Sequence, residues 1–220
     1  LESLLDQSSL FLQQLVNGIT LGGVYALIAV GYTMVYGVIQ LINFAHGEVY
    51  MLGAFLAYTL VAVLGMPFFP AFILTLLICA LLGVILDFVA YRPLRKAPRL
   101  AALITAIGMS IFLQNMALLI WGSQIKSYPR DMLPAFFSDA AITFADVSLS
   151  WLQLFILAIT LLSMIVLHLT IHKTRIGMAM RAISQDKTAS ALMGIGVNRV
   201  ISFTFAIGSA MGGMAGILVG

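Results

Sequence analysis

The residues that could do chemistry are few, and none of them forms a motif typical of an enzyme. The chain contains no GxSxG, HExxH, phosphate-binding P-loop or GxGxxG pattern. Serine, histidine and aspartate residues are present, but their spacing does not support an activated nucleophile. We therefore predict that the chain is not an enzyme and that it binds no cofactor itself. If ATP drives its activity, a separate chain must bind the nucleotide.

Two histidines have a spacing that could begin a metal site. His168 and His172 are four residues apart, which places both side chains on one face of a helix. A structural zinc ion takes four ligands, and neither an intervening glutamate nor a nearby third ligand is present. Histidines near the carboxyl end of a helix also complement its dipole. We favour this second interpretation and predict no metal site.

The segment Asn43–Glu48 is the densest polar stretch between two apolar runs. If the two apolar runs cross a membrane, an ionisable residue between them is a candidate functional residue, because a charge in the membrane core costs at least about 2.5–3.5 kcal/mol. Asn43, His46 and Glu48 could line a solute pathway or lock two helices together. Alternatively, Glu48 lies in the first turn of a helix, where the helix dipole stabilises a carboxylate. The sequence leaves both interpretations open.

The composition is that of a membrane protein. The chain has 220 residues, of which 62% are hydrophobic and 9% are charged, and its mean hydropathy is +1.09. Soluble domains carry about 25% charged residues, so this chain has too few charges to cover a surface that faces water. A single cysteine, Cys79, allows no intramolecular disulfide, and a net charge of +3 without a broad basic face argues against nucleic-acid binding. We expect an all-α polytopic membrane protein with the lipid bilayer as a partner.

Six stretches are long and apolar enough to cross a bilayer, which takes about 20 residues of helix. The turn Gly65-Met66-Pro67 separates the second stretch from the third, because glycine and proline interrupt helices. Residues 37–47 either end the first span or turn back into the membrane. The predicted spans are residues 10–36, 48–64, 69–90, 101–121, 151–171 and 200–220.

The distribution of lysine and arginine predicts the orientation of these spans. Residues 91–100 contain Arg92, Arg95, Lys96 and Arg99 without an acidic residue. The segment 172–199 is also strongly basic, so both are predicted to be cytoplasmic. In the loop 122–149, Lys126 and Arg130 are outnumbered by Asp131, Asp139 and Asp146, which predicts an outer loop. Counting spans backwards then places the N-terminus outside.

Glycines at helical spacing predict close helix packing. Gly18 and Gly22 form a GxxxG pair in the first span, and Gly208, Gly212, Gly216 and Gly220 recur every four residues along the last span. Small residues let helix backbones approach each other where no hydrophobic effect drives association. We expect these faces to pack against other helices or another subunit.

The segment Arg175–Ile195 is too long and too regularly patterned for a simple connection between spans. An apolar stripe at helical spacing, interrupted by Arg181 and Asp186, predicts a short helix that ends at Gly194. Such a helix could contact a cytoplasmic partner, or it could lie on the lipid surface.

Several of these stretches resemble a known family, the LivH-like permeases of bacterial branched-chain amino acid importers of the ABC class. The resemblance covers nearly the whole chain. The stretches that carry it are Asn17–Leu27, Gly31–Gly37, Ile42–Glu48, Ala90–Arg95, Ala106–Asn115 and Arg175–Ile195. The family has further spans beyond the position of Gly220, so the resemblance implies a chain that forms the N-terminal part of a larger permease.

The resemblance implies a single transmembrane permease domain over residues 1–220, in the bacterial inner membrane. The expected solutes are leucine, isoleucine and valine. The expected partners are a second, LivM-like permease, two cytoplasmic ATPase subunits that hold ATP and magnesium, and a periplasmic binding protein. A coupling loop within residues 172–199 would contact the ATPase through Arg181, Ala182, Asp186, Ala189, Gly194 and Ile195.

Three alternatives remain at this point. A related permease could carry urea or a short amide instead of an amino acid. An ion-coupled secondary transporter would take up solute without partner chains, and a channel or structural subunit would show no dependence on ATP. The absence of a cluster of intramembrane acids and bases, together with the patterned segment Arg175–Ile195, favours the ABC importer.

Overall fold

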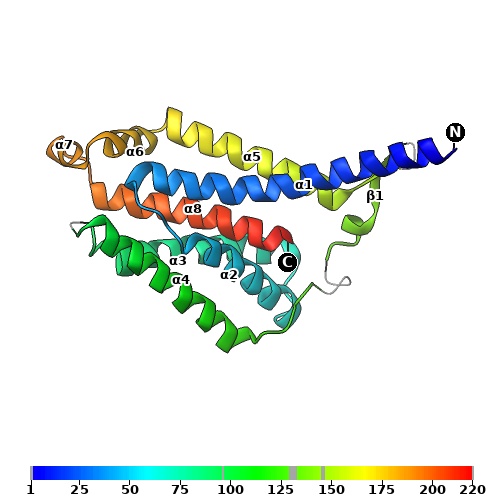
Figure 1. Cartoon of the computed structure of the whole chain (residues 1–220), viewed down its shortest axis with the longest axis horizontal. Helices are drawn as coiled ribbons and strands as arrows, with labels where there is room; N and C mark the ends of the chain where they lie inside the picture. The colour runs from blue at the N-terminus through cyan, green and yellow to red at the C-terminus, as the bar shows by residue number, and fades with distance from the viewer. Residues whose placement is uncertain (1, 96, 129–132, 145–146, 220) are drawn as a thin grey trace.

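Six long apolar helices run along the molecule (Figure 1). The computed structural model describes residues 2–95, 97–128, 133–144 and 147–219. Within these residues, the stretches able to cross a membrane are Ser9–Ile39, His46–Val63, Phe68–Tyr91, Leu100–Trp121, Trp151–Lys173 and Val197–Val219. They confirm the predicted all-α membrane helix bundle, and no boundary differs from its predicted position by more than three residues.

Most of the helices are joined by short connections, and the longest connection lies between α4 and α5. The long helices are α1 (Glu2–Ile39), α2 (His46–Tyr58), α3 (Phe68–Leu86), α4 (Arg99–Trp121), α5 (Trp151–Lys173) and α8 (Val197–Val219). Single π-helical turns, Thr59–Val63 and Asp87–Tyr91, extend α2 and α3. Two short helices, α6 (Arg175–Gln185) and α7 (Lys187–Leu192), join α5 to α8. The loop before α5 holds a 3₁₀ turn (Ala135–Ser138) and a hairpin of β1 (Ala140–Phe144) and β2 (Val147–Ser150).

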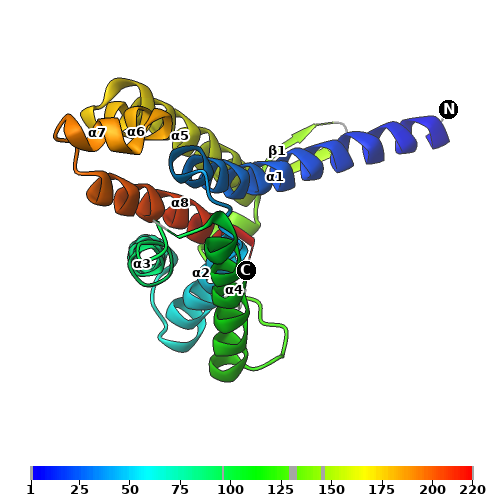
Figure 2. The ribbon, with the colours of Figure 1, turned by 60° about the vertical axis from the view of Figure 1, so that its left-hand side comes forward.

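The central helix of the bundle is α8. Its most apolar window is 61% buried, against 17% for the corresponding windows of α4 and α5. It packs against α1, α2 and α3. Figure 2 shows it between α1 and α5 on one side and α2, α3 and α4 on the other. The peripheral helices α4 and α5 instead carry exposed apolar side chains, such as Leu119 and Leu161, on their outer faces.

The glycines of α8 lie where neighbouring helices come closest. A Cβ atom at Gly208 would lie 2.7 Å from a methyl carbon of Val35 and 2.9 Å from the carbonyl oxygen of Gly31 on α1. Gly212 faces His46 and Tyr50, and Gly216 faces the backbone of α2. By contrast, Gly18 and Gly22 have no atom within 4 Å of such a Cβ. Both glycines lie on an exposed face of α1, whereas Gly23 on its other face meets Thr160 of α5. Among the described residues this pair therefore packs against no helix, and its packing against another subunit stays a prediction.

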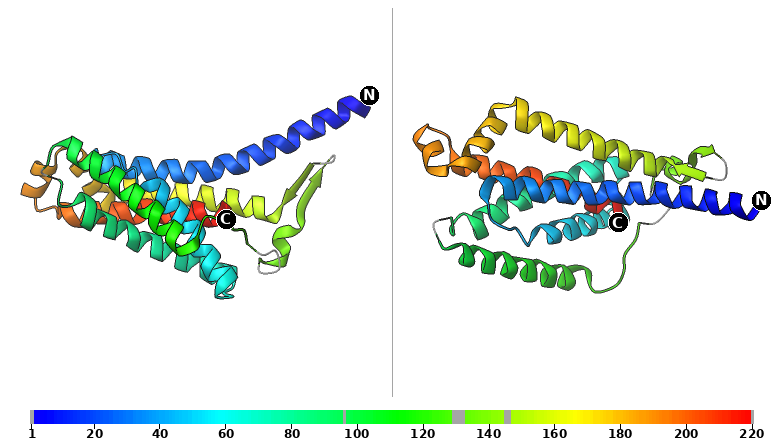
Figure 3. Two further views of the ribbon diagram at one scale, coloured as in Figure 1. Left: turned by 60° about the horizontal axis from the view of Figure 1, so that its bottom comes forward. Right: turned by 45° about the horizontal axis from the view of Figure 1, so that its top comes forward.

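The two ends of the bundle differ in chemistry. The connection after α3, with Arg92 and Arg95, lies at the same end as α6 and α7, and we call this the basic end. The hairpin β1–β2 and the start of α1 lie at the opposite end, here called the hairpin end (Figure 3). The predicted cytoplasmic segments thus share one end. Five residues named in the sequence analysis lie outside the described residues: Lys96, Arg130, Asp131, Asp146 and Gly220.

Local contacts fix the loop at the hairpin end. Ser150 begins α5 with a capping box, in which its hydroxyl accepts from the Gln153 amide and the Gln153 side chain accepts from the Ser150 amide. Gln13 on α1 accepts from the Ser148 amide at 2.8 Å. The Tyr128 hydroxyl donates to the Ile217 carbonyl at 3.3 Å, and burial raises the pKa of this phenol. The loop is thereby attached to both α1 and α8.

The segment predicted as one short helix is two helices. Asp186 has an extended backbone, and its carboxylate accepts from the amides of Thr188 and Ala189. This N-cap starts α7 and ends α6, because a side chain that bonds the next turn competes with helix continuation. Gly194 follows α7 with φ +83°, so the predicted stop is confirmed while the predicted continuity is wrong.

A glycine substitution at the α2–α8 contact tests this packing. In Gly53→Ala, the new methyl would lie 2.6 Å from Gly213 Cα, so the two backbones must separate. We expect a loss of about 1–3 kcal/mol of stability, measured as a lower Tm of the purified protein in detergent. Gly18→Ala is the matched control, since it has the same gain in helix propensity and meets no neighbour. Equal Tm values for the two variants would contradict the packing described.

Candidate functional site

The connection between α1 and α2 re-enters the bundle. Gln40 turns the chain with φ +56°, and α2 then begins at His46, beside Ile28 of α1. Ile28 is eleven residues before the end of α1, so at 1.5 Å per residue α2 begins about 16 Å inside that end. This distance is half the thickness of a bilayer core, which is about 30 Å. Non-helical backbone at such depth occurs where protein buries it or where it lines a cavity.

A cavity of ≈ 490 Å³ lies at this point, between α1 and the start of α2, and we call it the α1–α2 cavity. Aromatic side chains form much of its wall, and two of them, Tyr25 and Phe44, are 63% and 45% exposed. Asn43 and His46 supply its buried polar groups. The volume is in the usual range for small-molecule sites.

His46 lines this cavity and is buried, with 2% of its surface exposed. Its Nε2 lies 3.2 Å from the Ile28 carbonyl oxygen, and its ring meets Tyr32 edge to face at 6.0 Å. A carbonyl can only accept, so Nε2 carries the proton and Nδ1 is left as an acceptor. That Nδ1 atom has no hydrogen-bond partner among the described residues.

Asn43 is equally buried, and it is held by one side-chain contact and one backbone contact. Its Oδ1 accepts from the hydroxyl of Tyr91 at 2.8 Å, and its carbonyl accepts from the His46 amide at 3.2 Å. Within the described chain its Nδ2 donates to nothing. A buried donor without a partner costs about 1–3 kcal/mol of stability. Such a group therefore needs an explanation, and a bound ligand would supply the missing acceptor.

Glu48, the third predicted pathway residue, lies apart from the cavity. Its Oε1 accepts from Ser110 and from Gln114, both at 2.7 Å, and these residues belong to α4. A second contact on the same pair of helices joins Trp121 to Thr59 at 2.7 Å. Glu48 therefore links α2 to α4, while Asn43 and His46 face α1.

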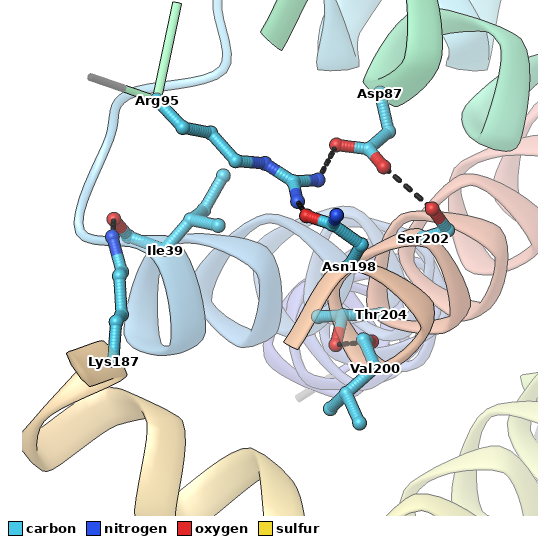
Figure 4. A network of polar contacts seen from close by, with 8 residues as sticks. All are labelled: Ile39, Asp87, Arg95, Lys187, Asn198, Val200, Ser202 and Thr204. Atoms are coloured by element: carbon cyan, nitrogen blue, oxygen red, sulfur yellow. Dashed lines mark hydrogen bonds and ion pairs between the residues drawn. The ribbon is translucent and has the colours of Figure 1, made fainter. Parts of the chain in front are cut away.

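A second polar cluster lies at the basic end (Figure 4). Asp87 is fully buried, and its carboxylate accepts from Arg95 at 2.5 Å and from the Ser202 hydroxyl at 2.6 Å. Arg95 also donates to Asn198 at the start of α8. The cluster thereby joins α3, the basic connection that follows it, and α8.

Sequence reasoning missed Asp87, although a signal was present. Asp87 is the single charged residue in the predicted span 69–90, and a charge within a span is costly unless it is paired. The basic residues that follow offered a partner. The orientation argument uses Arg92, Arg95 and Arg99 only as loop charges and pairs none of them with Asp87.

The predicted coupling residues are divided between solvent and bundle. Asp186, Ala189 and Gly194 are exposed at the basic end, while Ala182 is half-buried. Arg181 is exposed but donates to the Ile171 carbonyl, so it caps α5. Ile195 packs against the core cluster that includes Ile39 and Tyr91. At the tip of α7, Leu192 and Met193 of the predicted apolar stripe are 84% and 83% exposed, although neither is among the predicted coupling residues.

Two polar contacts connect this segment to the end of α1. Lys187 Nζ donates to the Ile39 carbonyl at 2.9 Å, as Figure 4 shows. Gln40 Nε2 donates to the Ser184 carbonyl at 3.1 Å. Movement of α6 and α7 would therefore act on the residues that lead into the α1–α2 cavity.

His168 and His172, the two histidines with metal-ligand spacing, lie side by side on α5. The rings of His168 and His172 lie 4.4 Å apart near the carboxyl end of α5. Among the described residues, no group of three or more His, Cys, Asp or Glu side chains could hold a metal ion.

The amino-acid sequence matches a known protein family. The profile of the family described as branched-chain amino acid transport system / permease component matches residues 14–220. The chain belongs to this family. It is a multi-pass membrane permease subunit and not an enzyme.

Individual relatives extend the match along most of the chain. The high-affinity branched-chain amino acid transport system permease protein BraD of Pseudomonas aeruginosa is 46% identical over 96% of this chain and 71% of that protein. The permease protein LivH of Salmonella typhimurium is 44% identical over 98% of this chain and 72% of that protein. A probable LivH of Methanocaldococcus jannaschii is 26% identical over 88% of this chain and 61% of that protein. No solved structure matches significantly.

The buried ion pair of this permease subunit gives a testable prediction. Asp87→Asn leaves the guanidinium of Arg95 without its carboxylate, and breaking a buried pair costs about 3–5 kcal/mol. We expect a large fall in Tm in detergent for Asp87→Asn. The double variant Asp87→Asn/Arg95→Gln should recover part of it, because the unpaired charge is gone. A double variant no more stable than the single one would show that the pairing is not what Asp87 contributes.

Proposed function

We propose that this chain forms one half of the transmembrane pore of an ATP-driven importer for leucine, isoleucine and valine, in the inner membrane of a bacterium. The observation that carries the proposal is the 46% identity to BraD over 96% of the chain. The relatives compared above are named for branched-chain amino acids, which favours this solute class over urea or a short amide. Six candidate spans and the absence of a nucleotide-binding motif in the sequence fit a permease that relies on other chains for ATP.

The open side of the α1–α2 cavity is the proposed path for the solute. Exposed aromatic side chains there, Tyr25 and Phe44, would meet a second, LivM-like permease, so that the path runs between the two subunits. A periplasmic binding protein would deliver the amino acid to the hairpin end. The basic end would then be cytoplasmic, as the positive-inside rule requires.

The helices α6 and α7 are the proposed docking element for one of the two ATPase subunits, which hold ATP and magnesium. Leu192 and Met193 project from the tip of α7 and offer an apolar contact. When ATP closes the ATPase subunits, displacement of α7 would pull on Ile39 through Lys187, and displacement of α6 would pull on Gln40 through Ser184. Transport requires that the two states differ in affinity for the solute and for ATP.

Uptake by the assembled importer tests the proposed function. The chain, its partner permease, the ATPase subunits and the binding protein are reconstituted in proteoliposomes. We expect labelled leucine to be taken up only with ATP and the binding protein together, and labelled urea not to be taken up. Uptake of urea would mean that urea, and not a branched-chain amino acid, is the solute. Leucine uptake that does not depend on ATP would exclude the ABC mechanism.

Docking on α7 is tested separately. The double variant Leu192→Asp/Met193→Asp places charges in the proposed apolar contact, so we expect the ATPase subunits to be lost on affinity purification of the permease. Ile125→Asp, at a fully exposed position in the loop of the hairpin end, is the matched control and should retain them. Retention of the ATPase by the double variant would exclude α7 as the docking element.

A further inference from the structure

The amino end of α2 is uncapped inside the bundle. No side chain of the N-cap residue Ala45 bonds to its first turn. The amide of His46 is bonded to the Asn43 carbonyl and that of Val49 to the Ala45 carbonyl, which leaves the amides of Gly47 and Glu48 at the helix end. The hydrogen bonds of the Glu48 carboxylate go to α4 and not to these amides. A helix end of this kind favours an anionic group.

Two buried side chains add polar atoms of opposite character beside this helix end. Asn43 Nδ2 is a donor and His46 Nδ1 is an acceptor, and neither has a partner among the described residues. Both residues are 2% exposed and line the α1–α2 cavity. The site thus offers donors for an anion and an acceptor for a cation within the six residues Asn43–Glu48.

We propose that the α1–α2 cavity binds the zwitterionic head of the transported amino acid during its passage. The carboxylate is placed at the amino end of α2 and Asn43 Nδ2, and the ammonium group at His46 Nδ1. The aromatic rings of Tyr25, Tyr32 and Phe44 receive the aliphatic side chain. This inference rests on the proposed function and assigns its substrate contacts.

The chemistry of the site selects for both charges at once. A carboxylate without an ammonium group leaves His46 Nδ1 unpaired, and an amine without a carboxylate leaves the helix end and Asn43 Nδ2 unpaired. A site built to hydrogen-bond a group discriminates strongly against an analogue that lacks it, because its own buried groups then stay unsatisfied. The apolar wall accepts leucine, isoleucine and valine alike, since it makes no directional contact.

Photolabelling tests the site in the assembled importer. Photo-leucine carries a diazirine in its side chain and retains both charged groups. It is illuminated with the importer in nanodiscs, and adducts are mapped by mass spectrometry. We expect adducts within residues 25–47. Excess leucine should suppress them, whereas equal concentrations of 4-methylpentanoate or 3-methylbutylamine should not. Adducts confined to other segments, or equal competition by all three compounds, would overturn the proposal.

Two variants remove one half of the site each. Asn43→Asp keeps an oxygen that accepts from Tyr91 but repels the carboxylate of the amino acid by its negative charge. His46→Leu removes the nitrogen that accepts from the ammonium group. Each should lower labelling within residues 25–47 by about tenfold or more. Thr33→Val is the matched control in the same cavity, because the Thr33 hydroxyl is already bonded to the Val30 carbonyl. It should label like the wild type.

Basal ATP hydrolysis and subunit copurification show whether each variant has folded. If one variant fails to fold, the other still tests the site, because Asn43 and His46 make different contacts in the structure. Full labelling in a folded Asn43→Asp or His46→Leu importer would overturn the site while wild-type leucine uptake leaves the proposed function standing. Failure of the wild-type importer to take up leucine would overturn both.

Discussion

The close contact of α8 with α1, α2 and α3 is the constraint on which the rest of the structure depends. Glycines at positions 208, 212, 213 and 216 remove the side chains that would otherwise hold these helices apart. Where no hydrophobic effect operates between helices, such direct backbone contact is the main source of association. It also fixes the depth of α2, whose first residue, His46, fits between Gly31 of α1 and Gly212 of α8.

The two polar clusters are connected by hydrogen bonds through the end of α3. Asn43 belongs to the cavity, yet its partner Tyr91 ends the π-helical turn that also holds Asp87. Asp87 in turn connects through Arg95 to the start of α8. Residues 39–43 therefore receive contacts from α7, from α6 and from the end of α3. A movement of α6, α7 or the end of α3 would therefore be transmitted to residues 39–43, which lead into the α1–α2 cavity.

Much of the fold was predictable because it depends on length and composition. Apolar length determined the six spans, and four-residue spacing identified the α8 glycines. The start of α2 was not predictable, because Asn43–Glu48 reads equally well as an interfacial turn, and only the contact of His46 with Ile28 places it deep in the bundle. Arg95 follows Asp87 by eight residues and could have been recognised as its partner, whereas Ser202 lies 115 residues away, so no spacing indicates that contact. The break at Asp186 depends on competition between a cap and a helix, which pattern alone does not decide.

The accessibility of Gly47 to water tests the central claim, that the start of α2 lies on the solute path. Gly47 is exposed, and a side chain there would meet no neighbour, whereas the native Cys79 is buried. In the assembled importer with Gly47→Cys, we predict reaction with a membrane-impermeant thiol reagent, at a rate that changes when a non-hydrolysable ATP analogue traps the ATPase subunits. A thiol that is unreactive in every nucleotide state would mean that lipid or protein covers this position, and would contradict the account.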